Sequence, residues 1–173
     1  DSLVVDPHKW LFSPFDCAAL LYRNPEVARA AHRQHAGYLD PIIDDTVWNP
    51  CDYAHVLTRR ARGMPFWFSL AVHGTDAYRD AIEGTLEVAR ATREMVVDAE
   101  YLELIVEPEL SVVAFRRTGW DLADYQQWCD RLLAEGMALL TPTTVDDEPA
   151  MRVCIINPRT TVDDLAMILA TLA

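Results

Sequence analysis

The sequence lacks the features that mark membrane proteins and nucleic-acid-binding proteins. No apolar run approaches the roughly 20 residues that a membrane-spanning helix needs, and no signal-peptide pattern is visible. Positive charge is scarce, since 15 Lys and Arg stand against 27 Asp and Glu and leave a net charge of −12. Nucleic acids and anionic membranes are polyanions, so this balance disfavours both as partners.

Paired cysteines and clustered histidines are missing as well. The cysteines are scattered in or near apolar runs without C-x-x-C spacing, which predicts reduced thiols and a cytoplasmic protein. The histidines show no spacing typical of metal ligands, so we expect no metal ion. The residues in question are Cys17, Cys51, Cys129 and Cys154, and His32, His35, His55 and His73.

An initiator methionine is also missing from the start of the sequence. Residues 2–6 read as a buried strand, and such a strand needs neighbours on both sides, so we expect the C-terminal piece of a longer protein. Residues 16–22 predict a second strand, with Pro7 and Pro14 as breakers between the two. Lys9 would then lie at a strand end, where the sites of α/β proteins are usually found.

Helical patterns dominate the next part of the chain. Pro25 is well placed in the first turn of a short helix over residues 26–33. Residues 34–53 lack periodicity, which is typical of a functional or mobile loop. The pattern turns helical over residues 57–74, and residues 76–98 predict a clearer amphipathic helix.

From about residue 100 onward the pattern predicts a small α+β unit. Four strands are interrupted by one helix and followed by another, and the first helix is capped by Asp121 and ended by Gly136. The expected strands are residues 102–106, 110–116, 137–140 and 151–156, and the expected helices are residues 121–135 and 161–172.

Lys9 is the residue whose surroundings suggest chemistry. A lysine amine attacks an aldehyde only in its neutral form, whereas water holds its pKa at about 10.4. Apolar residues flank Lys9 on both sides, at Val4-Val5 and at Trp10-Leu11-Phe12, and His8 adds an imidazole next to it. We therefore expect the Lys9 side chain to be partly desolvated, which favours the neutral amine.

The whole run around Lys9 resembles the cofactor-lysine segment of the group II pyridoxal-phosphate decarboxylases. That family includes decarboxylases of aromatic amino acids, histidine, glutamate, aspartate and cysteine sulfinate. Its signature is Asn/Asp-Pro-His-Lys-Trp, then an apolar pair, then Asp-Cys. The matching positions are Asp6 to Trp10, Leu11-Phe12 and Asp16-Cys17. The resemblance continues through Tyr38, residues 58–62 and residues 66–68 into the last part of the chain, so it covers essentially the whole sequence.

The resemblance implies an α/β protein of the fold-type I, pyridoxal-phosphate-dependent transferase-like class. Residues 1–99 would be the end of the large-domain sheet, with a catalytic loop at about 34–53 and connecting helices, and residues 100–173 a small α+β C-terminal domain. The implied cofactor is pyridoxal 5'-phosphate, and the implied reaction converts an L-amino acid to an amine and CO2. The implied partners are the N-terminal portion of the same enzyme and a second copy in a homodimer.

Five residues receive roles from the resemblance. Lys9 would carry the cofactor as a Schiff base, and Tyr38 would match the loop tyrosine that is the family's proposed proton donor. Relatives that form aldehydes tend to carry Phe there, so Tyr38 favours plain decarboxylation. His8 and Asp6 would approach the cofactor phosphate; since a carboxylate repels a phosphate, Asp6 has the alternative role of capping a turn. Thr58 matches a position near the substrate side chain.

The resemblance also implies that part of the site lies elsewhere. The carboxylate that pairs with the pyridine nitrogen and the loop that binds the phosphate precede the lysine in this family. We therefore expect the 173-residue chain to be inactive without an N-terminal portion. The identity of the L-amino acid stays open, because residues that select the substrate lie partly in that portion.

Several alternatives stay open on the sequence alone. Arg59, Arg60 and Arg62 form a basic cluster that suits structural ion pairs or a clamp for a carboxylate or phosphate. A carbon–carbon lyase of the same fold, such as those that cleave phosphorylated sphingoid bases, tends to have Tyr after His-Lys, whereas Trp10 stands here. An aldehyde-forming relative and a non-catalytic C-terminal half that serves dimerisation are the other two alternatives.

Overall fold

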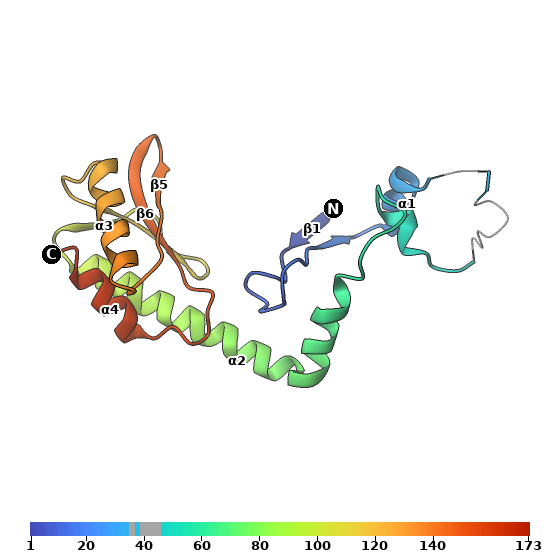
Figure 1. Cartoon of the computed structure of the whole chain (residues 1–173), viewed down its shortest axis with the longest axis horizontal. Helices are drawn as coiled ribbons and strands as arrows, with labels where there is room; N and C mark the ends of the chain where they lie inside the picture. The colour runs from blue at the N-terminus through green and yellow to red at the C-terminus, as the bar shows by residue number, and fades with distance from the viewer. Residues whose placement is uncertain (35–36, 39–45) are drawn as a thin grey trace. The chain divides into compact units, whose positions relative to one another are not determined.

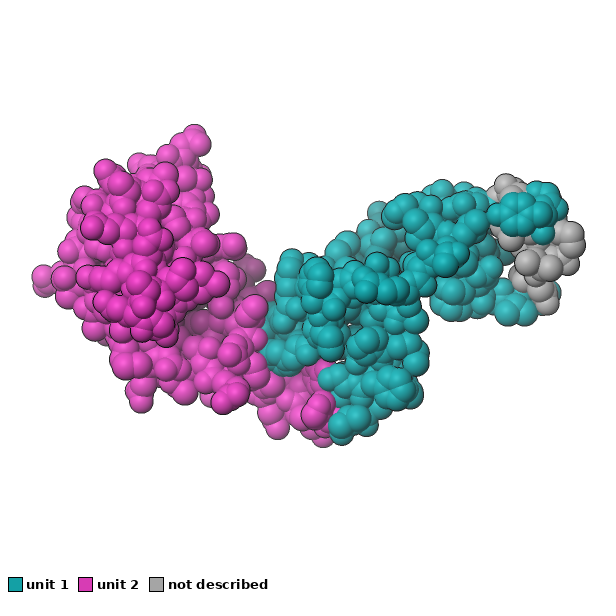
Figure 2. Space-filling view, viewed as in Figure 1, with its two compact units in different colours: residues 1–72 teal, residues 73–173 magenta. Residues whose placement is uncertain are grey.

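The computed structural model describes residues 1–34, 37–38 and 46–173 (Figure 1). These residues form two compact units, residues 1–72 and residues 73–173, which we call unit 1 and unit 2 (Figure 2). The domain boundary that we expected at 99/100 thus differs from the division into compact units, because residues 73–98 group with the residues that follow them. Residues 35–36 and 39–45 of the expected loop at 34–53, His35 among them, lie outside the described residues.

Unit 1 contains two short strands and a short helix. Strand β1 (Ser2–Val5) pairs antiparallel with β2 (Ala19–Tyr22), with Ser2 opposite Tyr22 and Val5 opposite Ala19. Helix α1 (Pro25–His32) begins after Asn24, whose side chain accepts a hydrogen bond from the backbone N–H of Glu26. The short 3-10 helix η2 (Pro50–Tyr53) follows the residues that the structure leaves undescribed.

Helix α2 (Gly63–Asp98) begins in unit 1 and ends in unit 2. Its backbone is non-helical at Gly74, where φ is 78° and ψ is 163°, a conformation that favours glycine because it has no Cβ. The two helices expected at 57–74 and 76–98 therefore meet at this break. The first of them begins at Gly63 rather than at residue 57, with Pro65 in the first turn, where a missing N–H costs nothing.

Unit 2 is built on a four-stranded antiparallel sheet with the order β3-β4-β6-β5. The expectation of a strand at 137–140 is wrong. After Gly136, which has a φ of 67°, the N–H groups of Met137 and Ala138 donate back to Leu132 O in the preceding helix, so they are not available to a sheet. The strands are β3 (Leu102–Leu104), β4 (Val112–Arg117), β5 (Pro142–Val145) and β6 (Glu148–Cys154).

Two capped helices complete unit 2. Helix α3 (Leu122–Ala134) is capped by Asp121, as expected, and helix α4 (Val162–Ala170) by Thr161. Each cap is reciprocal, because the side chain of Asp124 or Asp164 accepts a hydrogen bond from the backbone N–H of its capping residue. Both helix starts are thus fixed by short local sequences.

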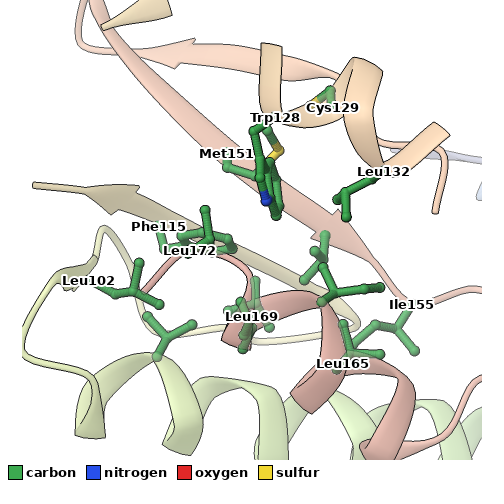
Figure 3. Packing of buried hydrophobic residues seen from close by; sticks show 14 of the residues in the cluster. Leu102, Phe115, Trp128, Cys129, Leu132, Met151, Ile155, Leu165, Leu169 and Leu172 are labelled. Atoms are coloured by element: carbon green, nitrogen blue, oxygen red, sulfur yellow. The ribbon is translucent and has the colours of Figure 1, made fainter. Parts of the chain in front are cut away.

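The hydrophobic core of the described residues lies in unit 2, between the sheet and the helices (Figure 3). Val113 and Phe115 of β4 point into it, as does Met151 of β6, whereas Val112 is exposed and Ala114 is only partly buried. Because the period of a strand is two, this pattern means that the helices cover one face of the sheet. Helix α2 contributes Val88, Ala89 and Val96, helix α3 Trp128 and Leu132, and helix α4 Leu165 and Leu169.

The helices of the described part of the chain show no membrane-spanning character. None combines the length and the apolar composition that crossing a bilayer requires.

Candidate functional site

The loop between β1 and β2 folds back on itself around Lys9. The N–H of Lys9 donates to Asp6 O at 2.9 Å, and the N–H of Ser13 donates to Pro7 O at 3.0 Å. Pro7 is fully buried, and the N–H of His8 donates to Cys17 O at 3.2 Å. These bonds connect residues 6–9 with residues 13–17, and we call residues 6–17 the lysine loop. The second strand begins at residue 19 rather than at 16 because the backbone of Cys17 pairs within this loop.

Lys9 is the only lysine in the 173-residue chain. Its Nζ lies 2.6 Å from Asp6 Oδ2, and its side chain is 62% exposed. The expected desolvation by the flanking apolar residues is therefore wrong for the described structure. The amine can be reached from outside, but it is held in an ion pair that must open before the amine can react.

Asp6 is the direct partner of Lys9. The hydrogen bond from Lys9 holds the pKa of the Asp6 carboxyl below its ordinary value, and the charges of Lys9 and His8 act in the same direction. A carboxyl with a lowered pKa stays ionised at neutral pH, so Asp6 accepts the hydrogen bond from Lys9 as a carboxylate. Its backbone oxygen also closes the turn at Lys9. Because a backbone oxygen closes the turn and the carboxylate pairs with Lys9 Nζ, the capping role of Asp6 and its approach to a phosphate both stay predictions.

The contacts of His8 restrict how it can act. Its Nδ1 lies 2.5 Å from Cys17 O and 3.2 Å from Cys17 N. One nitrogen cannot both donate and accept, and the shorter contact is to the carbonyl oxygen, so we assign the hydrogen to Nδ1. In the neutral ring Nε2 is then an acceptor. His8 can donate from Nε2 to a phosphate only as an imidazolium, which sharpens the prediction made from the sequence.

Ser13 was missed by the sequence reasoning. Its side chain is 5% exposed, and its Oγ has no hydrogen-bond partner among the described residues. Burying a hydroxyl without a partner costs free energy, so a polar group supplied from outside these residues would stabilise the loop. The accessible amine of Lys9 and this unsatisfied hydroxyl in one loop fit a ligand that carries both an aldehyde and polar substituents, as pyridoxal phosphate does. No pattern in the sequence marks Ser13.

The arginine cluster pairs with a residue of the lysine loop. Arg60 Nη2 lies 3.1 Å from Asp16 Oδ1, and Arg62 Nε lies 2.8 Å from Asp16 Oδ2. The hydrogen bond from Arg62 is the main reason why the pKa of Asp16 lies below its ordinary value. Arg59 donates instead to the backbone oxygen of Pro50 at 3.4 Å. For Arg60 and Arg62 the structure thus supports the ion-pair alternative.

A cavity of about 530 Å³ lies beside the cluster. The side chains of Trp48 and Met64 line it, together with all three arginines. A small anion is the kind of ligand that suits three guanidinium groups, and Asp16 neutralises part of their charge. The clamp alternative therefore stays open for Arg59.

Tyr38 and Thr58 are exposed and do not take part in the described contacts of the lysine loop. The side chain of Tyr38 is 73% exposed, and Thr58 is exposed as well. In the described part of the chain neither makes a hydrogen bond with the lysine loop. Residues 39–45, which follow Tyr38, lie outside that part. The roles expected for Tyr38 and Thr58 thus stay predictions.

A buried ion pair connects the two elements on either side of Tyr38. Arg29 Nε of α1 lies 2.9 Å from Asp52 Oδ2 of η2, and their side chains are 22% and 10% exposed. Tyr22 Oη also lies 3.3 Å from His32 Nε2 at the end of α1. Sequence reasoning missed the Arg29–Asp52 pair, because residues 23 positions apart share no local pattern.

Possible metal ligands are not gathered anywhere in the described residues. No three His, Cys, Asp or Glu side chains among them lie close enough to hold an ion.

Comparisons with known proteins place this geometry in a family. The family model described as the pyridoxal-dependent decarboxylase conserved domain matches residues 1–118. An aromatic-L-amino-acid decarboxylase of Bacillus atrophaeus is 29% identical over 98% of the chain, and an L-2,4-diaminobutyrate decarboxylase of Rhizobium meliloti is 33% identical over 97%. The chain spans only 37% and 35% of the length of these two relatives.

Solved structures agree on the fold. The crystal structure of Oryza sativa TDC with PLP and tryptamine matches 99% of the chain with a TM-score of 0.83 at 20% sequence identity, and the chain covers 38% of it. This confirms the expected fold class, an α/β fragment that corresponds to the C-terminal third of fold-type I decarboxylases. The chain is a member of the pyridoxal-dependent decarboxylase family.

Proposed function

We propose that this chain is the cofactor-lysine portion of an enzyme that decarboxylates an L-amino acid to an amine and CO2 with pyridoxal 5'-phosphate. The observation that carries the proposal is Lys9, the chain's only lysine, held accessible in a closed turn beside His8. When bound, the cofactor supplies a conjugated ring that accepts the electron pair of the broken Cα–carboxylate bond.

The residues of the lysine loop would act in a fixed order. Lys9 must leave Asp6 and lose a proton before its Nζ can bind the aldehyde carbon. His8, oriented by Cys17 O, would present Nε2 toward the phosphate as an imidazolium. Ser13 Oγ would find the partner that it lacks among the described residues.

Tyr38 is the proposed donor of the proton that returns to the substrate Cα. A phenol has a pKa of about 10 and can therefore donate at neutral pH. The support for this role is the position of Tyr38 in the sequence match. In the presence of dissolved O2 as the oxidant, a Tyr38→Phe variant should lose amine production and form an aldehyde by-product together with ammonia and CO2. Amine production at the parental rate without aldehyde would disprove the role.

The chain's length makes partners part of the proposal. It spans about a third of its relatives, so the proposed enzyme needs a further portion of chain and, we propose, a second copy in a homodimer. The carboxylate for the pyridine nitrogen and the phosphate loop would come from that further portion. The four cysteines are unpaired, which supports a reducing, cytoplasmic location.

The decisive experiment uses the full-length protein that contains this chain. Added pyridoxal 5'-phosphate should give a visible absorbance band that borohydride removes, and the Lys9→Ala variant should give none. A panel of aromatic, diamino, imidazole and acidic L-amino acids, analysed for amines and aldehydes, then identifies the substrate and the reaction. A colourless protein in excess cofactor would overturn the proposal in favour of a non-catalytic half.

A further inference from the structure

Asp16 receives two arginines from a distant part of the sequence. Each of its carboxylate oxygens accepts from a different guanidinium, at 3.1 Å from Arg60 and at 2.8 Å from Arg62. The arginines stand 44 and 46 residues later in the chain, just before α2. A carboxylate held from both oxygens has a fixed orientation as well as a fixed position.

The residue after Asp16 is the one that holds His8. The backbone oxygen of Cys17 accepts from both the N–H and the Nδ1 of His8, and the backbone N–H of Cys17 also faces Nδ1. His8 precedes Lys9 directly. The two arginines are thus separated from the reactive amine by a short run of peptide bonds and hydrogen bonds through Asp16, Cys17 and His8.

Stability alone does not account for this arrangement. Asp16, Arg60 and Arg62 are all at least partly exposed, and ion pairs of that kind contribute little to the free energy of unfolding. Orientation is what two donors on one carboxylate do provide.

We propose that Asp16, Arg60 and Arg62 form a positioning unit for Lys9 and His8. By fixing the peptide of Cys17, the unit holds the imidazole and the lysine turn in place before the cofactor arrives, so that binding does not have to order them. The inference rests on the proposed function and adds three residues to it. Arg62 has the shorter bond and the less exposed side chain, so its contribution should exceed that of Arg60.

The test compares variants of the full-length protein, each prepared free of cofactor. Asp16→Asn keeps the size of the side chain and removes its charge, Arg62→Gln replaces the guanidinium with a shorter neutral amide, and the double variant completes a cycle. Asp76→Asn is the matched control, because Asp76 pairs with Arg79 at 2.9 Å on the exposed surface of α2. The readouts are the Kd for added pyridoxal 5'-phosphate, the rate at which borohydride labels Lys9, and the melting temperature without cofactor.

We expect each single variant to weaken cofactor affinity roughly tenfold, the size usual for losing a supporting contact behind a functional ligand. The double variant should be no worse than the worse single variant, because either change breaks the same unit. Arg60→Gln should have a smaller effect and Asp76→Asn none. Asp16→Glu, which keeps a carboxylate, should recover part of the loss.

The outcomes separate this inference from the proposed function. If the parent protein labels at Lys9 while Asp16→Asn and Arg62→Gln bind cofactor and label like the parent, the positioning unit is disproved and the proposed function stands. If the parent itself does not label at Lys9, both fall. If Asp16→Asn does not fold, Arg62→Gln and Arg62→Lys decide in the same way; additive losses accompanied by an equal fall in melting temperature would also disprove positioning.

Discussion

The strands of the two units differ in how their side chains are buried among the described residues. In unit 2, the side chains of Val113 and Phe115 in β4 are fully buried, whereas those of the residues beside them are at least partly exposed, so the sheet has one covered face. In unit 1, the neighbouring residues Leu3 and Val4 of β1 are 60% and 66% exposed, although they point to opposite faces of the hairpin. Strands that are apolar on both faces are typical of the interior of α/β sheets. The comparison shows that unit 2 contains its own core, whereas unit 1 has apolar faces without cover among the described residues.

Ion pairs connect distant segments of unit 1. The Arg29–Asp52 pair connects α1 with η2, and Asp16 connects the lysine loop with Arg60 and Arg62. Such contacts are directional, so they fix positions while contributing little net free energy.

The strongest test of this comparison is to express the two units separately. Residues 73–173 expressed alone should unfold cooperatively, because all of the main core residues lie within that range. Residues 1–72 expressed alone should show no cooperative transition, because a two-stranded hairpin is at best marginally stable. Circular dichroism during thermal unfolding measures both. A cooperative transition in residues 1–72 would contradict the account of unit 1.

Two adjacent leucines of α3 sharpen the account of unit 2. Leu132 is fully buried in the core and Leu133 is mostly exposed. Leu132→Ala should lower the free energy of unfolding of unit 2 by about 2–5 kcal/mol, since it removes apolar contacts and leaves a cavity. Leu133→Ala, the matched control, should change it by less than about 0.5 kcal/mol. Urea denaturation followed by tryptophan fluorescence tests the pair, and equal effects would mean that α3 packs differently.

Asp52 tests the polar contacts of unit 1. Asp52→Asn removes the charge that faces Arg29 in a largely buried place, so local stability should fall by about 1–3 kcal/mol. Hydrogen exchange of the amides of α1 in the full-length protein measures this, and exposed Asp130 changed to Asn serves as the control. Unchanged protection of α1 in Asp52→Asn would show that the ion pair does not hold the two elements together.

Acid provides the smallest and most specific test. Hydrogen bonds from Thr161 hold the pKa of Asp164 below its ordinary value of 3.8. A carboxyl with a lowered pKa in the folded state stabilises that state above its unfolded pKa, and this stability is lost as the pH falls through the folded pKa. Unfolding of residues 73–173 should therefore become easier below about pH 4. Asp164→Asn should weaken this pH dependence. If stability falls equally in acid with and without the substitution, the helix cap does not contribute to it.

Local sequence patterns predicted much of the fold, but they could not predict contacts between residues that are far apart in the sequence. The start of α3 at Asp121 was predictable because a cap is read within four residues. The strand at 137–140 was wrong because Gly136 turns the chain so that the following N–H groups still serve α3. In unit 1 the segment around Lys9 was correctly predicted to be a turn between two strands. No local pattern predicted that Asp16 would pair with Arg60 and Arg62.

The candidate site was predictable to the same extent. The resemblance pointed to Lys9 and His8, whose roles stay predictions; the structure adds the pairing of Lys9 with Asp6 and of His8 with Cys17. The exposure of Lys9 was not foreseen, because apolar neighbours in sequence do not have to cover a side chain in space. The unsatisfied hydroxyl of Ser13 depends on the packing of its own loop and carries no signal in the sequence.

The single lysine has a consequence for selectivity. Every other basic side chain of the chain apart from the histidines is an arginine, and a guanidinium stays protonated at all physiological pH values and does not condense readily with aldehydes. An electrophilic carbonyl that encounters this polypeptide therefore finds one side-chain amine to modify. Within these 173 residues, the amino-acid composition alone therefore determines which side-chain amine reacts, without any contribution from a binding pocket.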